Sequence, residues 1–180
     1  AALAAGLTFL EYGSDLAGSV RIPAAMCGVY GLRPTAGTVP LAGFQPPGPP
    51  VLPSEQAYLS TLGPLARSAA DIRAALTATG GPHGAAALAH TWRLAPPRHD
   101  ALRDFRVGVV LDHPAAPVRS DVGDVLSAAV DALAAAGASI VEGWPDGVDA
   151  GRSAAAFGFQ VGAFFTLQQA GGADGPLAEF

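Results

Sequence analysis

The sequence predicts an α/β fold in which a mixed, mostly parallel sheet is flanked by helices on both faces. The main observation lies in the second half, where an apolar run (105–111), a helical segment (120–136) and another apolar run (138–142) follow one another. At this spacing the three segments form a right-handed βαβ unit with parallel strands. Ser120 is expected to cap the helix and Gly137 to end it. A second observation is the extended segment 58–66, which precedes another helix.

That second helix has a clear beginning and a clear end. Ser68 is expected to be its N-cap and Asp71 its third residue, which is close to a capping box. Gly80, Gly81 and Pro82 stop it. Earlier in the chain, residues 1–6 resemble the end of a helix, 7–12 have the length of a strand, and 22–28 are expected to form a short helix with Met26 and Cys27 facing inward. A further helix is expected over 152–170.

Composition excludes several classes of function. The 180 residues suffice for one domain with a core, and half of them are hydrophobic, as in globular proteins. The net charge is −5, and aspartates interrupt the densest arginine cluster (93–106), so we expect no nucleic-acid partner. No stretch is long enough to cross a bilayer, and we expect no membrane partner.

Cofactors and redox chemistry are also not indicated. The turn 112–117 lacks the glycine fingerprint that a dinucleotide site requires. The four histidines match no metal-ligand spacing, so we expect neither a metal nor an organic cofactor. The single cysteine, Cys27, cannot form an internal disulfide and fits a reducing compartment, from which we expect a cytoplasmic protein. Its apolar neighbours favour packing over nucleophilic chemistry.

Most of the chemical information lies in residues 13–24, which read GSDLAGSVRIPA. Here an apolar run breaks into a loop of small and polar residues. Ala17 and Gly18 let the backbone approach a ligand closely, and successive N–H groups in such a turn can converge on one anionic point. Pro23 suits the first turn of a helix. A serine in this setting, Ser19, is placed to attack a carbonyl beside a ready-made oxyanion site.

Two charged residues flank this serine. Asp15 and Arg21 bear opposite charges, and two interpretations are open. They form an ion pair that stiffens the loop, or one of them contacts the substrate. We favour the ion pair, because a nucleophile must be supported rigidly.

The segment resembles the signature of the amidase signature family. The matching positions are Gly13, Ser14, Asp15, Gly18, Ser19, Arg21, Pro23, Ala24, Cys27, Gly28, Gly31, Pro34 and Thr35. The match extends weakly to residues 63–68 and to the later strand–helix–strand pattern. Two departures are Ala17, where glycine is usual, and Arg33, where lysine is usual. The methyl group of Ala17 narrows the expected oxyanion site, whereas Arg33 keeps the charge.

The resemblance implies an amide hydrolase with a Ser-Ser-Lys triad. Ser19 would be the nucleophile, and the backbone N–H groups of Leu16, Ala17, Gly18 and Ser19 would hold the oxyanion. In the family the second serine, on a cis peptide bond, and the neutral lysine precede this segment. The chain has no lysine, and arginine cannot replace it because a guanidinium stays protonated. We therefore expect a fragment of a longer enzyme, inactive alone.

On this view residues 1–180 are part of one amidase domain. Its subregions are 1–82 (nucleophile loop and supporting helices), 83–104 (a connection) and 105–180 (the strand–helix–strand unit and a C-terminal helix). The expected partner is a small-molecule amide, and a homo-oligomer is left open. Two alternatives remain: a glutamine-dependent amidotransferase A-type subunit, which passes ammonia to a partner acting on charged tRNA, and a non-catalytic, truncated family member.

Overall fold

The computed structural model describes residues 1–42, 44, 59–114 and 116–169 of the chain. The described residues form two compact units, one containing residues 1–94 and those from 161 onward, the other residues 95–160. The predicted subregion boundaries at 82 and 104 stay predictions. Most of the proline-rich loop expected over 35–53 and the start of the extended segment 58–66 lie outside the described residues.

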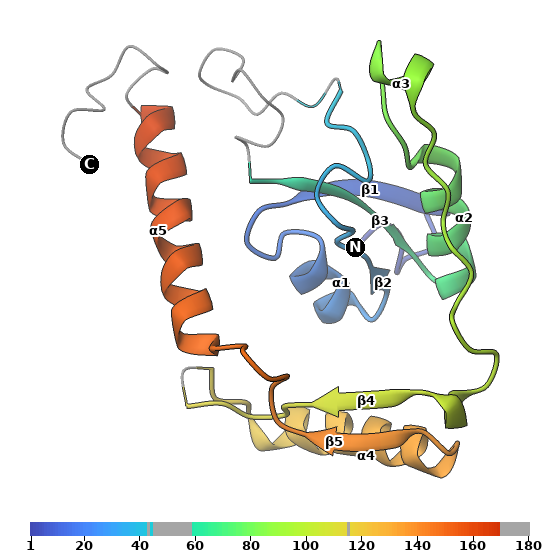
Figure 1. Ribbon diagram of the computed structural model, residues 1–180, viewed down its shortest axis with the longest axis vertical. Coiled ribbons are helices and arrows are strands. Elements are labelled where there is room, and N and C mark those ends of the chain that lie inside the picture. The colour runs from blue at the N-terminus through green and yellow to red at the C-terminus, as the bar shows by residue number, and fades with distance from the viewer. Residues whose placement is uncertain (43, 45–58, 115, 170–180) are drawn as a thin grey trace. The chain divides into compact units, whose positions relative to one another are not determined.

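The first unit is built on a three-stranded sheet (Figure 1). Its strands are β1 (Leu10–Asp15), β2 (Tyr30–Gly31) and β3 (Thr61–Ala66), in the order β1-β3-β2. Both pairings are antiparallel, with Leu10 opposite Ala66 and Asp15 opposite Thr61 in the β1–β3 pair. The Asp15 end of β1 is therefore where the chain enters the loop that carries Ser19.

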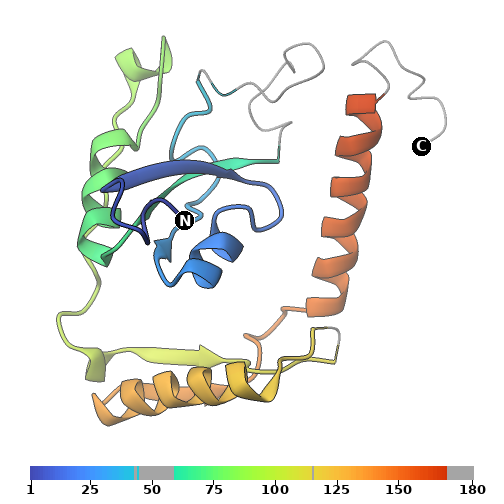
Figure 2. The same cartoon turned by 180° about the vertical axis from the view of Figure 1, so that it is seen from behind.

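Helices cover both faces of this sheet (Figures 1 and 2). Neighbouring residues of a strand point to opposite faces. A Cβ atom on Gly13 would lie 3.1 Å from Val20, just before helix α1 (Arg21–Cys27). The preceding residue, Tyr12, points to the opposite face, where its hydroxyl forms a hydrogen bond with the hydroxyl of Thr79 in helix α2 (Ala69–Thr79). The expectation of helices on both faces is thus confirmed for this sheet.

The ends of these helices follow local chemistry. The Ser68 hydroxyl accepts a hydrogen bond from the Asp71 amide at 3.0 Å, so the predicted cap of α2 is confirmed. Helix α1 ends at Gly28, whose φ of 65° is left-handed. Met26, however, is 83% exposed, so the prediction that it faces inward is wrong. Ala24 is the buried residue of α1, and two residues turn a helix by about 200°, which carries Met26 to the opposite side.

The first strand starts later than its sequence predicts. Residues 1–7 form hydrogen-bonded turns rather than a helix end, and β1 spans Leu10–Asp15 instead of 7–12. The Arg67 side chain donates to the carbonyl oxygens of Leu3 and Thr8, at 3.0 and 3.1 Å. This long-range contact holds the turns and is not visible in the local pattern.

The second unit contains the βαβ arrangement that the sequence predicts. Strands β4 (Arg106–Val109) and β5 (Ser139–Glu142) are parallel, with Arg106 opposite Ser139 and Val109 opposite Glu142. Helix α4 (Ser120–Ala135) connects them. Gly137, with a φ of 97°, follows α4 as expected, but Ser120 is its first residue and makes no side-chain cap. The second unit also contains a 3₁₀ turn (Leu102–Asp104). Of the two other described helices, α3 (Ala86–Ala89) lies in the first unit, and the residues of α5 (Ala150–Gln169) fall in both units.

The α/β class and the mixed pairing are therefore confirmed, with one correction. Among the described strands, the larger sheet is antiparallel and only the β4–β5 pair is parallel, so parallel pairs do not predominate there. A parallel pair needs a long crossover, usually a helix. Such a crossover, α4, joins β4 to β5, whereas β1 and β2, which flank α1 in the chain, do not pair with each other and each pairs antiparallel with β3 between them.

Candidate active site

Asp15 organises the loop that carries Ser19. Its side chain, at the end of β1, has no exposed surface. One carboxylate oxygen, Oδ1, accepts a hydrogen bond from the Gly18 amide at 2.7 Å. The other, Oδ2, accepts from the amides of Val20 and Arg21 at 3.2 and 3.3 Å. One buried carboxylate thereby fixes the backbone on both sides of Ser19.

Two arginines neutralise this carboxylate. Arg21 binds it in a fork, with Nε 2.9 Å from Oδ2 and Nη2 3.0 Å from Oδ1. Arg33 donates from Nε to the main-chain oxygen of Asp15 at 3.3 Å and lies 3.8 Å from Oδ1. The pKa of Asp15 is well below its usual value, first because of the Arg21 side chain and then because of the three amides, which together outweigh the effect of burial.

Asp15 and Arg21 therefore form the ion pair, which is one of the two interpretations that the sequence leaves open. The Arg21 side chain remains 53% exposed, so its guanidinium also meets solvent. The sequence does not predict the contact of Arg33 with Asp15. The sequence shows only that Arg33 is basic, as is the lysine usual at this position in the resembled family.

Ser19 lies on the outside of this loop. Its neighbours Gly18 and Val20 are buried, whereas Ser19 is exposed. Val20 has no exposed surface and packs beside Gly13 and Gly31. Gly18 has a φ of 120°, and its carbonyl oxygen accepts from the Ile22 amide at 2.8 Å. The serine is thus presented between two anchored residues, as a nucleophile requires.

The four amides expected to hold an oxyanion are not equivalent. The Gly18 amide already donates to Asp15, so its role in this structure is to hold the loop. Within the described ranges, the amides of Leu16, Ala17 and Ser19 donate no hydrogen bond. These three therefore have N–H groups to offer a ligand. Ala17 is exposed, so its methyl group lies at the surface of the loop.

A buried hydroxyl lies directly across the sheet from Asp15. Thr61 pairs with Asp15 in the β1–β3 ladder and is 2% exposed. Among the described residues its Oγ1 has no hydrogen-bond partner, although buried hydroxyls are usually paired. No local pattern points to this residue, because its burial depends on the pairing of distant strands.

The described polar residues offer no metal centre. In the part of the chain that the structure describes, no group of three or more histidine, cysteine, aspartate or glutamate residues could hold a metal ion. No described helix has both the length and the apolar character needed to cross a membrane.

The fold and the loop define an α/β protein with an exposed serine held beside backbone N–H groups that Asp15 does not engage. Comparison with known proteins identifies the class: the Amidase family matches residues 1–169, and the chain belongs to this family. The chain is 39% identical over 143 residues to the A-type subunit of a glutamyl-tRNA(Gln) amidotransferase from Deinococcus radiodurans, covering 78% of this chain and 28% of that protein. It is 36% identical over 159 residues to a 1-carboxybiuret hydrolase subunit from Pseudomonas sp., covering 86% and 32%.

Solved structures show the same fold. A peptide amidase from Stenotrophomonas maltophilia matches with a TM-score of 0.62 and 28% identity, over 93% of this chain and 35% of that one. A 6-aminohexanoate cyclic dimer hydrolase matches with a TM-score of 0.61 and 32% identity, over 81% and 30%. The chain thus spans about a third or less of the length of these relatives.

Proposed function

We propose that this segment carries the nucleophile of an enzyme that hydrolyses carboxylic amides. The Ser19 Oγ attacks the amide carbonyl, and its proton passes to a base. Ammonia or an amine leaves, which gives an acyl-Ser19 ester, and water then releases the acid. Support comes from the exposure of Ser19 between two anchored neighbours and from membership in the Amidase family.

The oxyanion would be held by the amides around Ser19. Leu16, Ala17, Gly18 and Ser19 are the proposed donors, and those of Leu16, Ala17 and Ser19 are the ones not engaged by Asp15. Preorganised N–H groups of this kind typically contribute about 3–4 kcal/mol each to transition-state stabilisation. Asp15 and Arg21 are proposed to support these donors indirectly, because Asp15 holds the neighbouring amides of Gly18, Val20 and Arg21.

The proton acceptor is proposed to lie outside these 180 residues. The chain has no lysine, and it spans about a third or less of its relatives. We therefore propose a Ser-Ser-Lys triad completed by a longer polypeptide, with this segment inactive alone. A cytoplasmic location is a further expectation, a homo-oligomer is left open, and no metal or organic cofactor enters the proposed mechanism.

Covalent labelling tests the assignment. The full-length polypeptide is treated with a fluorophosphonate, digested, and analysed by mass spectrometry. We expect the label on Ser19, and its loss together with amide turnover in Ser19→Ala. The matched control is Ser153→Ala, an exposed serine in α5, which should label and turn over normally. Turnover by Ser19→Ala near the normal rate would overturn the proposal.

A glutamine-dependent amidotransferase A-type subunit is the second candidate. It is favoured by the similarity to proteins named as such subunits, including those of Deinococcus radiodurans and Thermus thermophilus. Glutamine turnover that rises when a partner protein copurifies would support it. Turnover of simple amides without glutamine and without a partner would favour the amidase.

The third candidate is a non-catalytic, truncated member of the family. Sequencing the coding region upstream of Ala1 decides it: the absence of both a lysine and a serine-containing, glycine-rich loop there would make this account the better one.

A further inference from the structure

Thr61 holds a hydroxyl group that the fold leaves unused. The residue begins β3, is 2% exposed, and among the described residues its Oγ1 forms no hydrogen bond. Shielding a hydroxyl from water without giving it a partner costs stability, so such groups are rare in folded proteins. A role other than stability is therefore to be sought in what lies beside Thr61.

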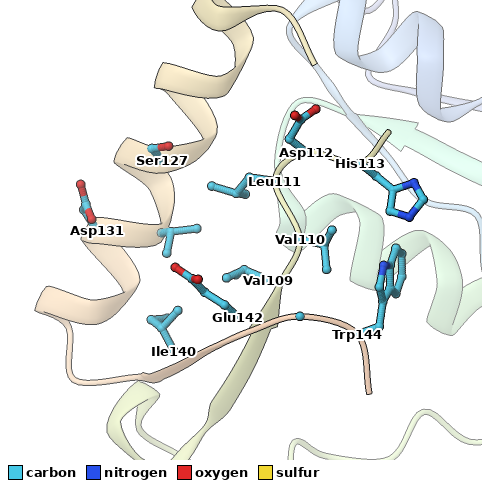
Figure 3. Close-up of a pocket in the computed structure, with 12 residues that line it drawn as sticks. Val109, Val110, Leu111, Asp112, His113, Ser127, Asp131, Ile140, Glu142 and Trp144 are labelled. Carbon is cyan, nitrogen blue, oxygen red and sulfur yellow. The ribbon is translucent and has the colours of Figure 1, made fainter. Parts of the chain in front are cut away.

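Exposed polar groups need no such role, because water satisfies them. In the second unit, a cavity beside α4 is lined by residues that include Asp131 and Glu142, and both are exposed (Figure 3). Figure 3 shows Asp131 on the outer side of α4, and Trp144 on the other side of β4 from Val109, so the polar and aromatic groups around this cavity do not converge. The hydroxyl of Thr61 has no comparable access to water.

Thr61 lies beside the carboxylate that holds the Ser19 loop. It pairs with Asp15 in the antiparallel β1–β3 ladder. Residues directly opposite each other carry their side chains on the same face of a sheet, with Cβ atoms about 4.5–5.5 Å apart. Gly13, two residues before Asp15, lies on that face and packs beside Val20 of the loop. The hydroxyl and the carboxylate are thus buried together, at a spacing that rotation about the Thr61 Cα–Cβ bond can close to hydrogen-bond length.

Two acceptors compete for the Gly18 amide. In this structure it donates to Asp15 Oδ1 at 2.7 Å, whereas the proposed mechanism also assigns it to the oxyanion. If the amide turns to the oxyanion, Oδ1 keeps the bond from Arg21 Nη2 at 3.0 Å but loses its shorter contact. The Asp15 side chain has no exposed surface, so water does not replace that contact. The loss would oppose the reaction unless another donor takes the place of the amide.

We infer that the Thr61 hydroxyl is that donor, an inference that rests on the proposed function. As the oxyanion forms at the carbonyl attacked by Ser19, the Gly18 N–H turns toward it, and the Thr61 O–H donates to Asp15 Oδ1 instead. No covalent bond changes in this exchange, and the two amides bonded to Oδ2 keep their partner. Thr61 is therefore a positioning residue. Its hydroxyl costs stability in the free enzyme and is used in the transition state, where an interaction raises kcat.

The test uses the full-length polypeptide and a fluorophosphonate, which forms a tetrahedral adduct on a reactive serine. The maximal labelling rate of Ser19 and the reagent concentration that gives half of it are measured separately. Thr61→Val removes the hydroxyl at nearly constant shape. It should lower the maximal rate at least about 10-fold, because loss of one oxyanion donor typically costs about 10²–10³-fold. The half-saturating concentration should not change. Thr61→Ser, which keeps the hydroxyl, should label within about 3-fold of the native rate.

Stability separates this role from a structural one. Thr61→Val should melt no lower than the native enzyme, since it removes a buried hydroxyl that has no partner among the described residues. The matched control is Thr77→Val in α2, whose exposed hydroxyl donates to the main-chain oxygen of Arg73. This variant should label at the native rate.

The outcomes distinguish this inference from the proposed function. If Ser19 of the native enzyme does not label, the proposed function fails and this inference fails with it. If the native enzyme labels, three results would each overturn the role of Thr61 alone: a native rate in Thr61→Val, an equal loss in Thr61→Ser, or a lower melting temperature of Thr61→Val. The last result would mean that Oγ1 has a structural partner in the longer polypeptide.

Discussion

Replacing Asp15 with asparagine tests how the Ser19 loop is held. The change keeps the size of the side chain but removes its charge and turns one acceptor oxygen into a donor. Asp15 accepts from three loop amides and from two nitrogens of Arg21. Removing one member of a buried ion pair costs about 3–5 kcal/mol. Because the Arg21 side chain is 53% exposed and stays hydrated, we expect a loss of about 2–3 kcal/mol in the free energy of unfolding.

Urea unfolding of the chain measures this loss, and pH supplies a second check. The pKa of Asp15 is depressed, chiefly by Arg21. A depressed pKa adds stability that is complete above the unfolded-state value of about 3.9 and is lost as pH falls through the folded-state pKa. The difference between the native chain and Asp15→Asn should therefore be constant from about pH 8 to 5 and shrink below about pH 4.

The comparison variant is Arg21→Gln, which leaves the three loop amides bonded to the carboxylate. This variant should lower the free energy of unfolding by about 1–2 kcal/mol, which is less than the loss expected for Asp15→Asn. The reasoning is refuted if Asp15→Asn costs under about 1 kcal/mol, or if its effect is the same at pH 3 as at pH 7.

Substitutions at three further positions test other contacts by urea unfolding. Thr61→Val should raise the free energy of unfolding by about 1–2 kcal/mol, because it removes a buried hydroxyl without a partner among the described residues; a decrease would show that Oγ1 is satisfied. Arg67→Ala should lower it by about 1–2 kcal/mol and speed amide exchange in residues 5–7, since Arg67 bonds to Leu3 and Thr8 and lies 5.7 Å from the Phe9 ring centroid. Unchanged exchange would argue against that clamp. Ser68→Ala should cost about 1 kcal/mol and Ser68→Asp almost nothing, and equal losses would exclude the cap.

The features that the sequence predicts well are those set by nearby residues. The βαβ unit follows from two apolar runs and a helix within some 40 positions, and the cap of α2 follows from two residues three apart. The short helix expected over 22–28 is present as α1 (Arg21–Cys27), and it ends before Gly28, which adopts the left-handed conformation. Each of these features is determined by residues close together in the chain, so the sequence pattern alone predicts it.

The features that the sequence does not predict depend on distant pairing. The direction of β1 against β3 is decided by residues about 50 positions apart, and the pattern of each strand is the same in either direction. Met26 looks like a core residue, yet no described element covers its side of α1. At the site, the motif locates Ser19, Asp15 and Arg21. It does not reveal that Asp15 uses the Gly18 amide, or that Arg33 joins the pair.

The loop also makes a prediction about glycine. Gly18 and Gly28 both have positive φ, of 120° and 65°. A Cβ atom at Gly18 would lie 2.6 Å from Ile22 Cδ1 and 2.9 Å from its Cγ1, whereas nothing lies within 4 Å at Gly28. Gly28→Ala should therefore cost only the backbone strain of about 1–2 kcal/mol. Gly18→Ala should cost about 1–2 kcal/mol more, because overpacking adds to the strain.

A double-mutant cycle separates the two contributions. Ile22 is 52% exposed, so Ile22→Ala alone should cost little. In the Gly18→Ala/Ile22→Ala double variant the clash is absent, and about 1 kcal/mol of the Gly18→Ala loss should return, while the strain remains. The same cycle on Gly28→Ala should be additive. Additivity at both glycines would mean that the loop relaxes away from Ile22. In that case the backbone around Ser19 would be held by Asp15 alone rather than by Asp15 and the packing of α1.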